Sequence, residues 1–185
     1  CTSLTKISIP SSITSIGENI FEGCKILNEI SIIQCNDKRI KFFEDKFLIY
    51  KSAPTIENYD TLVWANKTLD IVTIPSFIKI IESYSFRNNS LLTQIAIPLD
   101  ITSIGVSSFS NCSSLTQISI PSSITSIKNF TFYECLSLTQ ISIPLSVTSI
   151  GNYAFKGCSS LTQITIPSSV TSIGNYVFSG CSKIT

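Results

Sequence analysis

A phrase of 23 residues repeats along almost the whole chain, and each copy ends where the next begins. One copy reads CLSLTQISIPLSVTSIGNYAFKG from position 135, and the next reads CSSLTQITIPSSVTSIGNYVFSG from position 158. Full copies start at positions 1, 24, 66, 89, 112, 135 and 158, and a partial copy starts at position 181. Every step is 23 residues except the second, which is 42, so 19 additional residues lie within the second copy. One such unit cannot bury its apolar residues alone, whereas stacked units bury a continuous core, and the period therefore predicts a solenoid.

Apolar residues hold fixed positions within each unit. The seventh and ninth positions alternate with polar residues, as in LTQISI, which is the two-residue period of a strand with one buried face. A proline follows in six units and ends the strand, because it has no amide hydrogen to donate to a ladder. A second short apolar pair comes next, for example Ile124 and Ile127, and predicts a short second strand.

Most units close on a glycine and then a phenylalanine. We expect the glycine to permit a corner with positive φ. The closing segment, NYAFKGC in one copy, is too short for more than one turn of 3₁₀ or α-helix. The glycines are Gly17, Gly105, Gly151 and Gly174, and the phenylalanines are Phe21, Phe86, Phe109, Phe132, Phe155 and Phe178.

The pattern C-x-x-L-x-x-I-x-I-P-x-x-I-x-x-I-G-x-x-A-F-x-x-C resembles the BspA-like, treponemal class of leucine-rich repeat. The resemblance covers essentially the whole chain outside the additional residues, and its departures are local. Ile33 replaces the proline, Glu82 and Lys128 replace the glycine, and Asn66 and Asn89 replace the cysteine. We therefore predict that residues 1–185 form one mainly β leucine-rich-repeat solenoid. It is a right-handed superhelix of 23-residue units with a parallel β-sheet, a short second strand and a 3₁₀ or α turn per unit.

The insertion within the second unit spans residues 35–65. Two extended runs, FEDKFLIY and DTLVWA, flank the turn-rich APTIENY and predict a β-hairpin. Aromatic residues in a loop on a rigid scaffold are a candidate binding site. The alternative is that Trp64, Phe47 and Ile49 pack the hairpin onto the core. The aromatic candidates for a binding site are Tyr50, Tyr59 and Trp64, which is the only tryptophan.

Six of the seven cysteines occupy the first position of a unit. Equivalent residues on neighbouring strands lie about 4.8 Å apart, within the range of a disulfide. In-register side chains point the same way, however, and cysteine is among the most buried residue types. We therefore favour an inward ladder of free thiols, interrupted by Asn66 and Asn89, whose amides would hydrogen-bond the turn backbone. Cys35 is off register and is a candidate for a reactive thiol or an intermolecular bridge.

Composition excludes several function classes. Thirteen basic and twelve acidic residues leave a net charge of +1, which gives no electrostatic footprint for nucleic acid. No apolar run approaches the length of a membrane span, so we expect no membrane insertion within this segment. There is no histidine to act as the base of a nucleophile, which disfavours nucleophilic catalysis. The lack of histidine and of a C-x-x-C motif also disfavours a metal site. The glycines are single, which disfavours a phosphate-binding loop. We expect no catalytic residue, no metal and no cofactor, and hence no enzyme.

Outward-facing positions on the first strand form a candidate binding surface. Positions six and eight of each unit are mostly Gln, Ser or Thr, which makes a neutral surface suited to a protein or a glycan. The alternative is that these residues are only a soluble coating on the sheet. The candidate ligand-binding residues here are Gln94, Gln117, Gln140 and Gln163.

Four N-x-S/T sequons occur in the chain. We expect Asn66, on the inward ladder, to be unmodified. Asn88, Asn111 and Asn129 lie on the turn side and are candidates for N-glycosylation.

The family resemblance implies a function in adhesion or recognition. By this analogy, the chain is a cell-surface or secreted module that binds a matrix or host-cell protein, or a glycan. The chain opens at Cys1 without a methionine, and we expect it to be part of a longer protein whose signal and anchor lie elsewhere. One alternative is a structural spacer without a ligand. Another is an ice- or crystal-binding surface built on Thr102, Thr125, Thr148 and Thr171. Exposed terminal units also predict end-to-end self-association.

Overall fold

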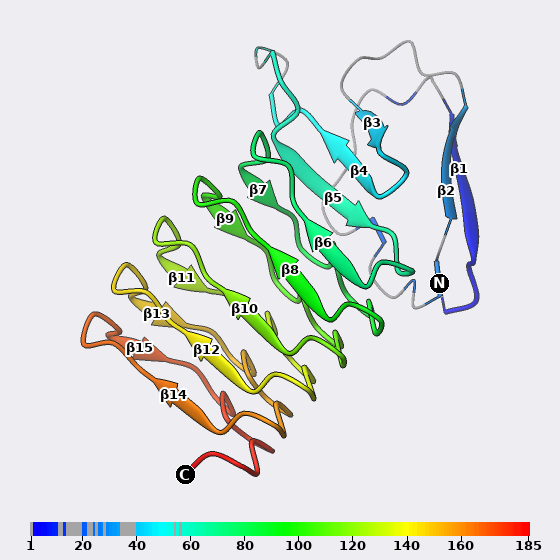
Figure 1. Ribbon diagram of the computed structural model, residues 1–185. Coiled ribbons are helices and arrows are strands. Elements are labelled where there is room, and N and C mark those ends of the chain that lie inside the picture. The colour runs from blue at the N-terminus through cyan, green and yellow to red at the C-terminus, as the bar shows by residue number, and fades with distance from the viewer. Residues whose placement is uncertain are drawn as a thin grey trace.

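Residues 66–185 fold into a stack of similar β-coils, as a computed structural model shows (Figure 1). The structure describes residues 2–10, 13, 20–21, 24, 26–27, 29–33, 40–53, 55 and 57–185. No helix occurs in these described stretches, and the coils carry parallel strands about 23 residues apart. The predicted leucine-rich-repeat solenoid is therefore confirmed.

The first strands of five coils form one parallel sheet, which we call the groove sheet. Its partners are in register 23 residues apart, for example Gln117 with Gln140 and Gln140 with Gln163. Two further strands, one from each of the first two units, pair in parallel as a separate sheet. The groove sheet contains β6 (Ile71–Thr73), β8 (Gln94–Ala96), β10 (Gln117–Ser119), β12 (Gln140–Ser142) and β14 (Gln163–Thr165), and the separate sheet contains β1 (Lys6–Pro10) and β2 (Glu29–Ile33).

The core lies between the two strands of each coil. On the groove sheet the seventh-position residues such as Ile118 and Ile141 are buried, while their neighbours on the same strands are exposed, as the alternation predicts. The closing phenylalanines form a buried stack along the solenoid axis. Ring centroids are 5.2 Å apart for Phe86 and Phe109, and 5.7 Å apart for Phe109 and Phe132.

The segment expected to be a 3₁₀ or α turn is instead a run of β-turns, so this detail was wrong. The 19th and 23rd residues of the coil have positive φ, for example Ser107 at 53° and Asn111 at 60°. A right-handed helical turn requires negative φ throughout. The amides alternate accordingly: Phe109 donates to Thr131 O of the next coil, whereas Ser110 donates to Ser107 O within its own coil. Half of these amides thus join neighbouring coils.

The corner glycines serve a different purpose from the one expected. Positive φ occurs at Gly157 (79°) and Gly180 (81°), at the 23rd position, and not at Gly105, Gly151 or Gly174. A Cβ placed on Gly151 would lie 2.6 Å from the backbone nitrogen of Asn129 in the coil below. Glycine is therefore required there because two backbones approach closely. Gly17 lies outside the described residues.

The second strands form a sheet that is divided in two. One part is the three-stranded sheet of β11 (Ser126–Ile127), β13 (Ser149–Ile150) and β15 (Ser172–Ile173). The other part contains β7 (Ile80–Ile81) and β9 (Ser103–Ile104). Strands β9 and β11 are not paired, although they come from consecutive coils. We call this interruption the seam.

Two substitutions in the repeat explain the seam. Lys128 occupies the corner position, where Gly105, Gly151 and Gly174 donate their amides to the coil below at 2.7–2.8 Å. No such bond from the Lys128 amide occurs within residues 57–185, all of which the structure describes. We infer that the Cβ of Lys128 keeps the coils apart at this corner, because a Cβ added to Gly105 or Gly151 would lie 2.2–2.8 Å from atoms of the coil below. Val106 adds to the effect, because a valine cannot accept the side-chain bond that asparagines accept in later coils.

The insertion forms three strands that extend the second-strand sheet beyond β7. Strands β3 (Ile40–Phe43) and β4 (Phe47–Tyr50) make an antiparallel hairpin, and β4 also pairs antiparallel with β5 (Thr61–Ala65). Strand β5 then pairs in parallel with β7, which continues the insertion into the solenoid. Cys35 lies outside the described residues.

Candidate functional site

A groove of about 780 Å³ follows the groove sheet across five coils. In-register pairing places one glutamine above the next, because each is the sixth residue of its unit. The side chains of these strands alternate outward and inward, so the glutamines face the groove and the isoleucines between them face the core. The glutamines that line the groove are Gln94, Gln117, Gln140 and Gln163.

The chemistry of this groove is uncharged and hydrogen-bonding. None of its lining residues is ionisable. On the edge strand β6 the lining includes Ile71, which occupies the position where other coils carry glutamine and is 61% exposed. Within the fully described residues 57–185, the four glutamine amides make no hydrogen bond to one another or to other protein groups. They are available to a ligand. The lining provides amide and hydroxyl groups and no ionisable side chain, so hydrogen bonding is the interaction that it offers to a ligand.

Aromatic residues of the insertion do not join this groove. Trp64 is 2% exposed and meets Phe42 edge-on with ring centroids 6.3 Å apart. Phe47 and Ile49 are also buried. An indole this deeply buried packs the insertion onto the fold and is not an exposed binding residue. This agrees with the alternative that these residues pack the hairpin onto the core.

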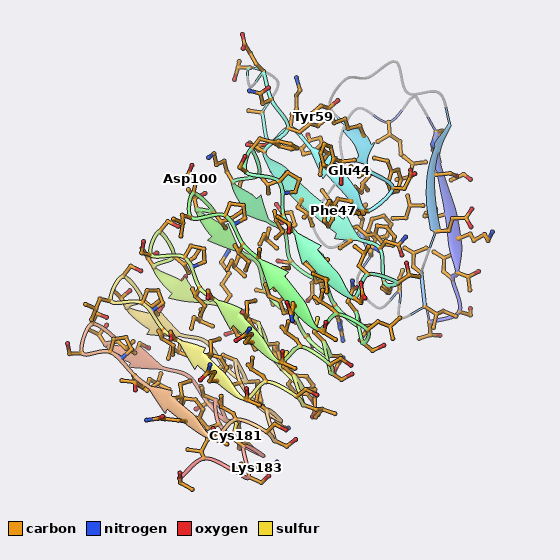
Figure 2. All side chains as sticks on the ribbon, in the orientation of Figure 1. Glu44, Phe47, Tyr59, Asp100, Cys181 and Lys183 are labelled. Carbon is orange, nitrogen blue, oxygen red and sulfur yellow. The ribbon has the colours of Figure 1, made fainter. Side chains whose placement is uncertain are left out.

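Tyr50 and Tyr59 are both half-buried, and neither lines the groove. Tyr50 packs in the cluster around Trp64. The ammonium groups of Lys41 and Lys51 lie 4.4 and 5.4 Å from the Tyr59 ring centroid, an arrangement typical of cation–π contacts. Tyr59 lies well away from the groove sheet (Figure 2). The structure therefore does not bring the glutamines and the aromatic candidates into one site.

The cysteine ladder is inert. Cys112, Cys135 and Cys158 are free and buried, and the Sγ of Cys112 donates to the carbonyl oxygen of Phe86 in the coil below at 3.2 Å. Burial raises the pKa of Cys112 to about 12, and burial, together with the neighbouring Cys112 and Glu134, raises the pKa of Cys135 well above its usual range. These groups are thiols and not thiolates at neutral pH, which removes them as nucleophiles. Cys24 is likewise free and buried, and Cys181 is free and half-buried.

Asparagines replace cysteine in the ladder with the hydrogen bonds that were expected. The Nδ2 of Asn89 donates to the backbone oxygen of Asn66 at 2.9 Å, and the Oδ1 of Asn66 accepts the amide of Thr68 at 3.1 Å. Cys1, which would begin the ladder, lies outside the described residues.

The sequon asparagines differ in their surroundings. The Nδ2 of Asn111, the atom that a glycan would occupy, donates to Asn88 Oδ1 at 2.9 Å, and both residues are half-buried. Asn129 is exposed, and its Oδ1 accepts the amide of Asn152 at 2.8 Å. A glycan replaces one of the two hydrogens on Nδ2, so at Asn111 it would attach to a nitrogen that already makes a side-chain bond, whereas the bond of Asn129 uses its Oδ1.

The threonines that could form an ice- or crystal-binding surface offer few hydroxyl hydrogens to solvent. Thr148 Oγ1 donates to Thr125 O at 3.2 Å, and Thr171 Oγ1 donates to Thr148 O at 3.3 Å. Thr102 donates in the same way to Lys79 O. These hydroxyl hydrogens are used to join the coils.

The described residues contain no group of three or more histidine, cysteine, aspartate or glutamate side chains that could hold a metal ion. In the same part of the chain, no helix is long and apolar enough to cross a bilayer.

Comparison with known proteins places these features in a family. The model of the BspA-type leucine-rich repeat region matches residues 1–48 and 55–185 in six copies, and it describes a repeat region and not a catalytic domain. A leucine-rich cell surface protein from Faecalibacterium prausnitzii A2-165 has a similar structure, with 34% identity and a TM-score of 0.88 over 98% of this chain and 47% of that one. A leucine-rich repeat protein from T. pallidum is 25% identical, with a TM-score of 0.60 over 100% of this chain and 67% of that one.

The pneumococcal vaccine antigen PcpA shares the fold, with 22% identity and a TM-score of 0.80 over 98% of this chain and 44% of that one. The chain thus spans about half the length of the Faecalibacterium and pneumococcal structures. No curated protein matches it. The match over nearly all of its residues shows that the chain belongs to the family of BspA-type leucine-rich repeat proteins.

Proposed function

We propose that the chain is a recognition module of a cell-surface protein and that it binds a matrix protein, a host-cell protein or a glycan in the glutamine-lined groove. The observation that carries the proposal is the row of in-register glutamines, whose amides have no partner within the fully described residues 57–185. Membership in a leucine-rich-repeat family supports a binding role. The Faecalibacterium protein, 34% identical, is described as a cell surface protein, which supports the location.

The glutamine row has the capacity for specific but uncharged recognition. Each amide offers two donors and one acceptor oxygen. The groove spans five strands at about 4.8 Å spacing, or roughly 20 Å from the first to the last. A typical interface carries about ten direct hydrogen bonds, so these amides can supply a large share of them. Because no ionisable residue lines the groove, the affinity should change little between low and high salt.

Binding of the purified chain to a panel of immobilised matrix proteins and glycans tests this proposal. In the double variant Gln117→Arg/Gln140→Arg, two cations fill the middle of the groove, and we expect binding to fall at least tenfold. The matched control Ser122→Arg/Ser168→Arg adds the same charge at exposed turn positions outside the groove, and it should bind like the parent. Equal loss in both double variants would contradict a groove site. Binding to no member of the panel would favour the structural spacer.

A further inference from the structure

The groove presents its polar groups in two parallel rows that run along the stack of coils (Figure 1). The sixth residues of the units form an amide row, and the eighth residues form a hydroxyl row. The side chains of both rows are exposed, and within the fully described residues 57–185 they make no hydrogen bond to the protein. The amide row contains Gln94, Gln117, Gln140 and Gln163, and the hydroxyl row contains Thr73, Ser119, Ser142 and Thr165.

The two rows form a lattice with two fixed spacings. In-register pairing repeats each group along the stack at the strand separation, which is about 4.8 Å. Across the groove, the sixth and eighth residues of one strand lie two residues apart, which is roughly 6.6 Å. Between the rows the floor is flat, because the seventh residues, such as Ile118 and Ile141, are buried beneath the strands. A ligand that uses the whole groove therefore needs polar groups on both of its edges and a repeat of about 4.8 Å.

A β-1,4-linked hexose chain has both properties. It advances by nearly the strand separation with each sugar, and its equatorial hydroxyl groups lie along the two edges of a flat ribbon. An extended polypeptide advances by about 3.4 Å per residue, and its equivalent groups repeat at roughly 6.8 Å, so it loses register with the amides within two coils. Every lining residue of the groove lies within residues 57–185 and none is ionisable. A charged glycan would therefore lose water without gaining an ionic partner, which favours a neutral one.

We propose that the groove binds a neutral β-1,4-linked glycan that runs along the stack with one sugar per coil. This inference rests on the proposed function and names its ligand class. The glutamine amides bond the hydroxyl groups along one edge of the glycan, and the serine and threonine hydroxyls bond those along the other edge. A glutamine side chain has three rotatable bonds, so it absorbs the small difference between the two repeats.

The two rows predict how the affinity depends on the length of the glycan. The coils of β10, β12 and β14 present both an amide and a hydroxyl group. The coil of β8 presents only an amide, because Ala96 takes the hydroxyl position, and the coil of β6 presents only a hydroxyl, because Ile71 takes the amide position. The affinity should therefore rise steeply up to three sugars and less for the fourth and fifth. A sixth sugar meets no strand of the groove sheet and should add nothing.

Titration of the full chain with cello- and chito-oligosaccharides of two to six sugars tests this inference. The readout is the set of NMR signals from the glutamine side-chain amides. Maltopentaose is the matched control for cellopentaose, because its α-1,4 links join the same glucose units into a curved chain. We expect saturable binding of a β-1,4-linked pentasaccharide, and an affinity for maltopentaose that is at least tenfold lower. Equal binding of maltopentaose, or no gain between two and three sugars, would overturn the inference.

Two substitutions locate the glycan in the groove. Gln140→Leu removes an amide from the middle of the row and should weaken pentasaccharide binding roughly two- to tenfold, the range for one lost hydrogen bond. Ile71→Gln adds an amide in register with Gln94 and should tighten binding of the pentasaccharide but not of the trisaccharide. Such a gain cannot result from misfolding. Ser122→Ala, at an exposed turn outside the groove, is the control and should bind like the parent.

The outcomes distinguish this inference from the proposed function. Suppose that a matrix or host-cell protein binds, that the double variant Gln117→Arg/Gln140→Arg abolishes this binding, and that no oligosaccharide binds. Only the glycan inference is then overturned, and the partner is a protein. If instead an oligosaccharide binds equally to the parent, to Gln140→Leu and to Ile71→Gln, its site lies outside the groove and both proposals fail.

Discussion

Replacing Gly151 by alanine tests why glycine occupies the corner of the coil. The added Cβ would lie 2.5 Å from Asn129 Oδ1 and 2.6 Å from Asn129 N, whereas ordinary van der Waals contacts begin at 3.4 Å. The backbone nitrogen cannot rotate away as a flexible side chain could. The coils must therefore separate at this corner, as they do beside Lys128.

The expected loss follows from the bonds that join the two coils at this corner. Three of them would be broken or lengthened, and each contributes about 0.5–1.5 kcal/mol net, so the unfolding free energy should fall by about 2–4 kcal/mol. The three bonds run from Gly151 N to Ile127 O at 2.7 Å, from Asn152 N to Asn129 Oδ1 at 2.8 Å and from Thr148 N to Thr125 O at 2.9 Å.

Urea unfolding followed by far-ultraviolet circular dichroism measures this loss. Gly180→Ala is the matched control, because φ at Gly180 is 81° and the nearest atom to its Cβ would be 3.5 Å away. That variant meets only left-handed backbone strain, about 1–2 kcal/mol, and Gly180→Asn should be milder because asparagine tolerates this region better. A Gly151→Ala loss no larger than that of Gly180→Ala would refute the argument from close approach. A Gly151→Asn variant as stable as the parent would refute it too.

Three other predictions concern the seam, the thiols and the end of the stack. The double change Val106→Asn/Lys128→Gly should close the seam, so that the amide at position 128 gains protection in hydrogen exchange; an unchanged exchange rate would contradict the steric explanation. The buried thiol of Cys112 has a folded-state pKa of about 12 against an ordinary 9.0, so its contribution to stability is complete below pH 9 and is lost as the pH rises from 9 towards 12. Cys112→Ala should therefore flatten the fall of the urea midpoint as the pH rises above 9, and an equally steep fall would argue against burial as its cause. Ile173 and Tyr176 are 51% and 65% exposed on the last complete coil, and sedimentation velocity should show self-association that Tyr176→Asp weakens; a monomer at high concentration would contradict end-to-end packing.

The candidate site was only partly predictable from the sequence. Strand alternation identified Gln94, Gln117, Gln140 and Gln163 as outward-facing, because a period of two residues depends only on the local backbone. Trp64 is different. As the only tryptophan it could be identified as a candidate, but its burial depends on how β5 of the insertion packs beside β7. A cavity that Trp64 borders combines residues from two units and the insertion. Their proximity could not be predicted from their positions in the sequence.

The repeat by itself determined the solenoid and the inward-facing isoleucines, phenylalanines and cysteines. These features follow from one unit and its period, because identical units stack in identical register. Only the tertiary structure decided the contacts between coils. Positive φ falls on Ser107 and Asn111 and not on Gly151, and Lys128 opens the second-strand sheet. The physical reason is that close approach of two backbones is a property of the pair of coils, whereas the sequence pattern describes each coil singly.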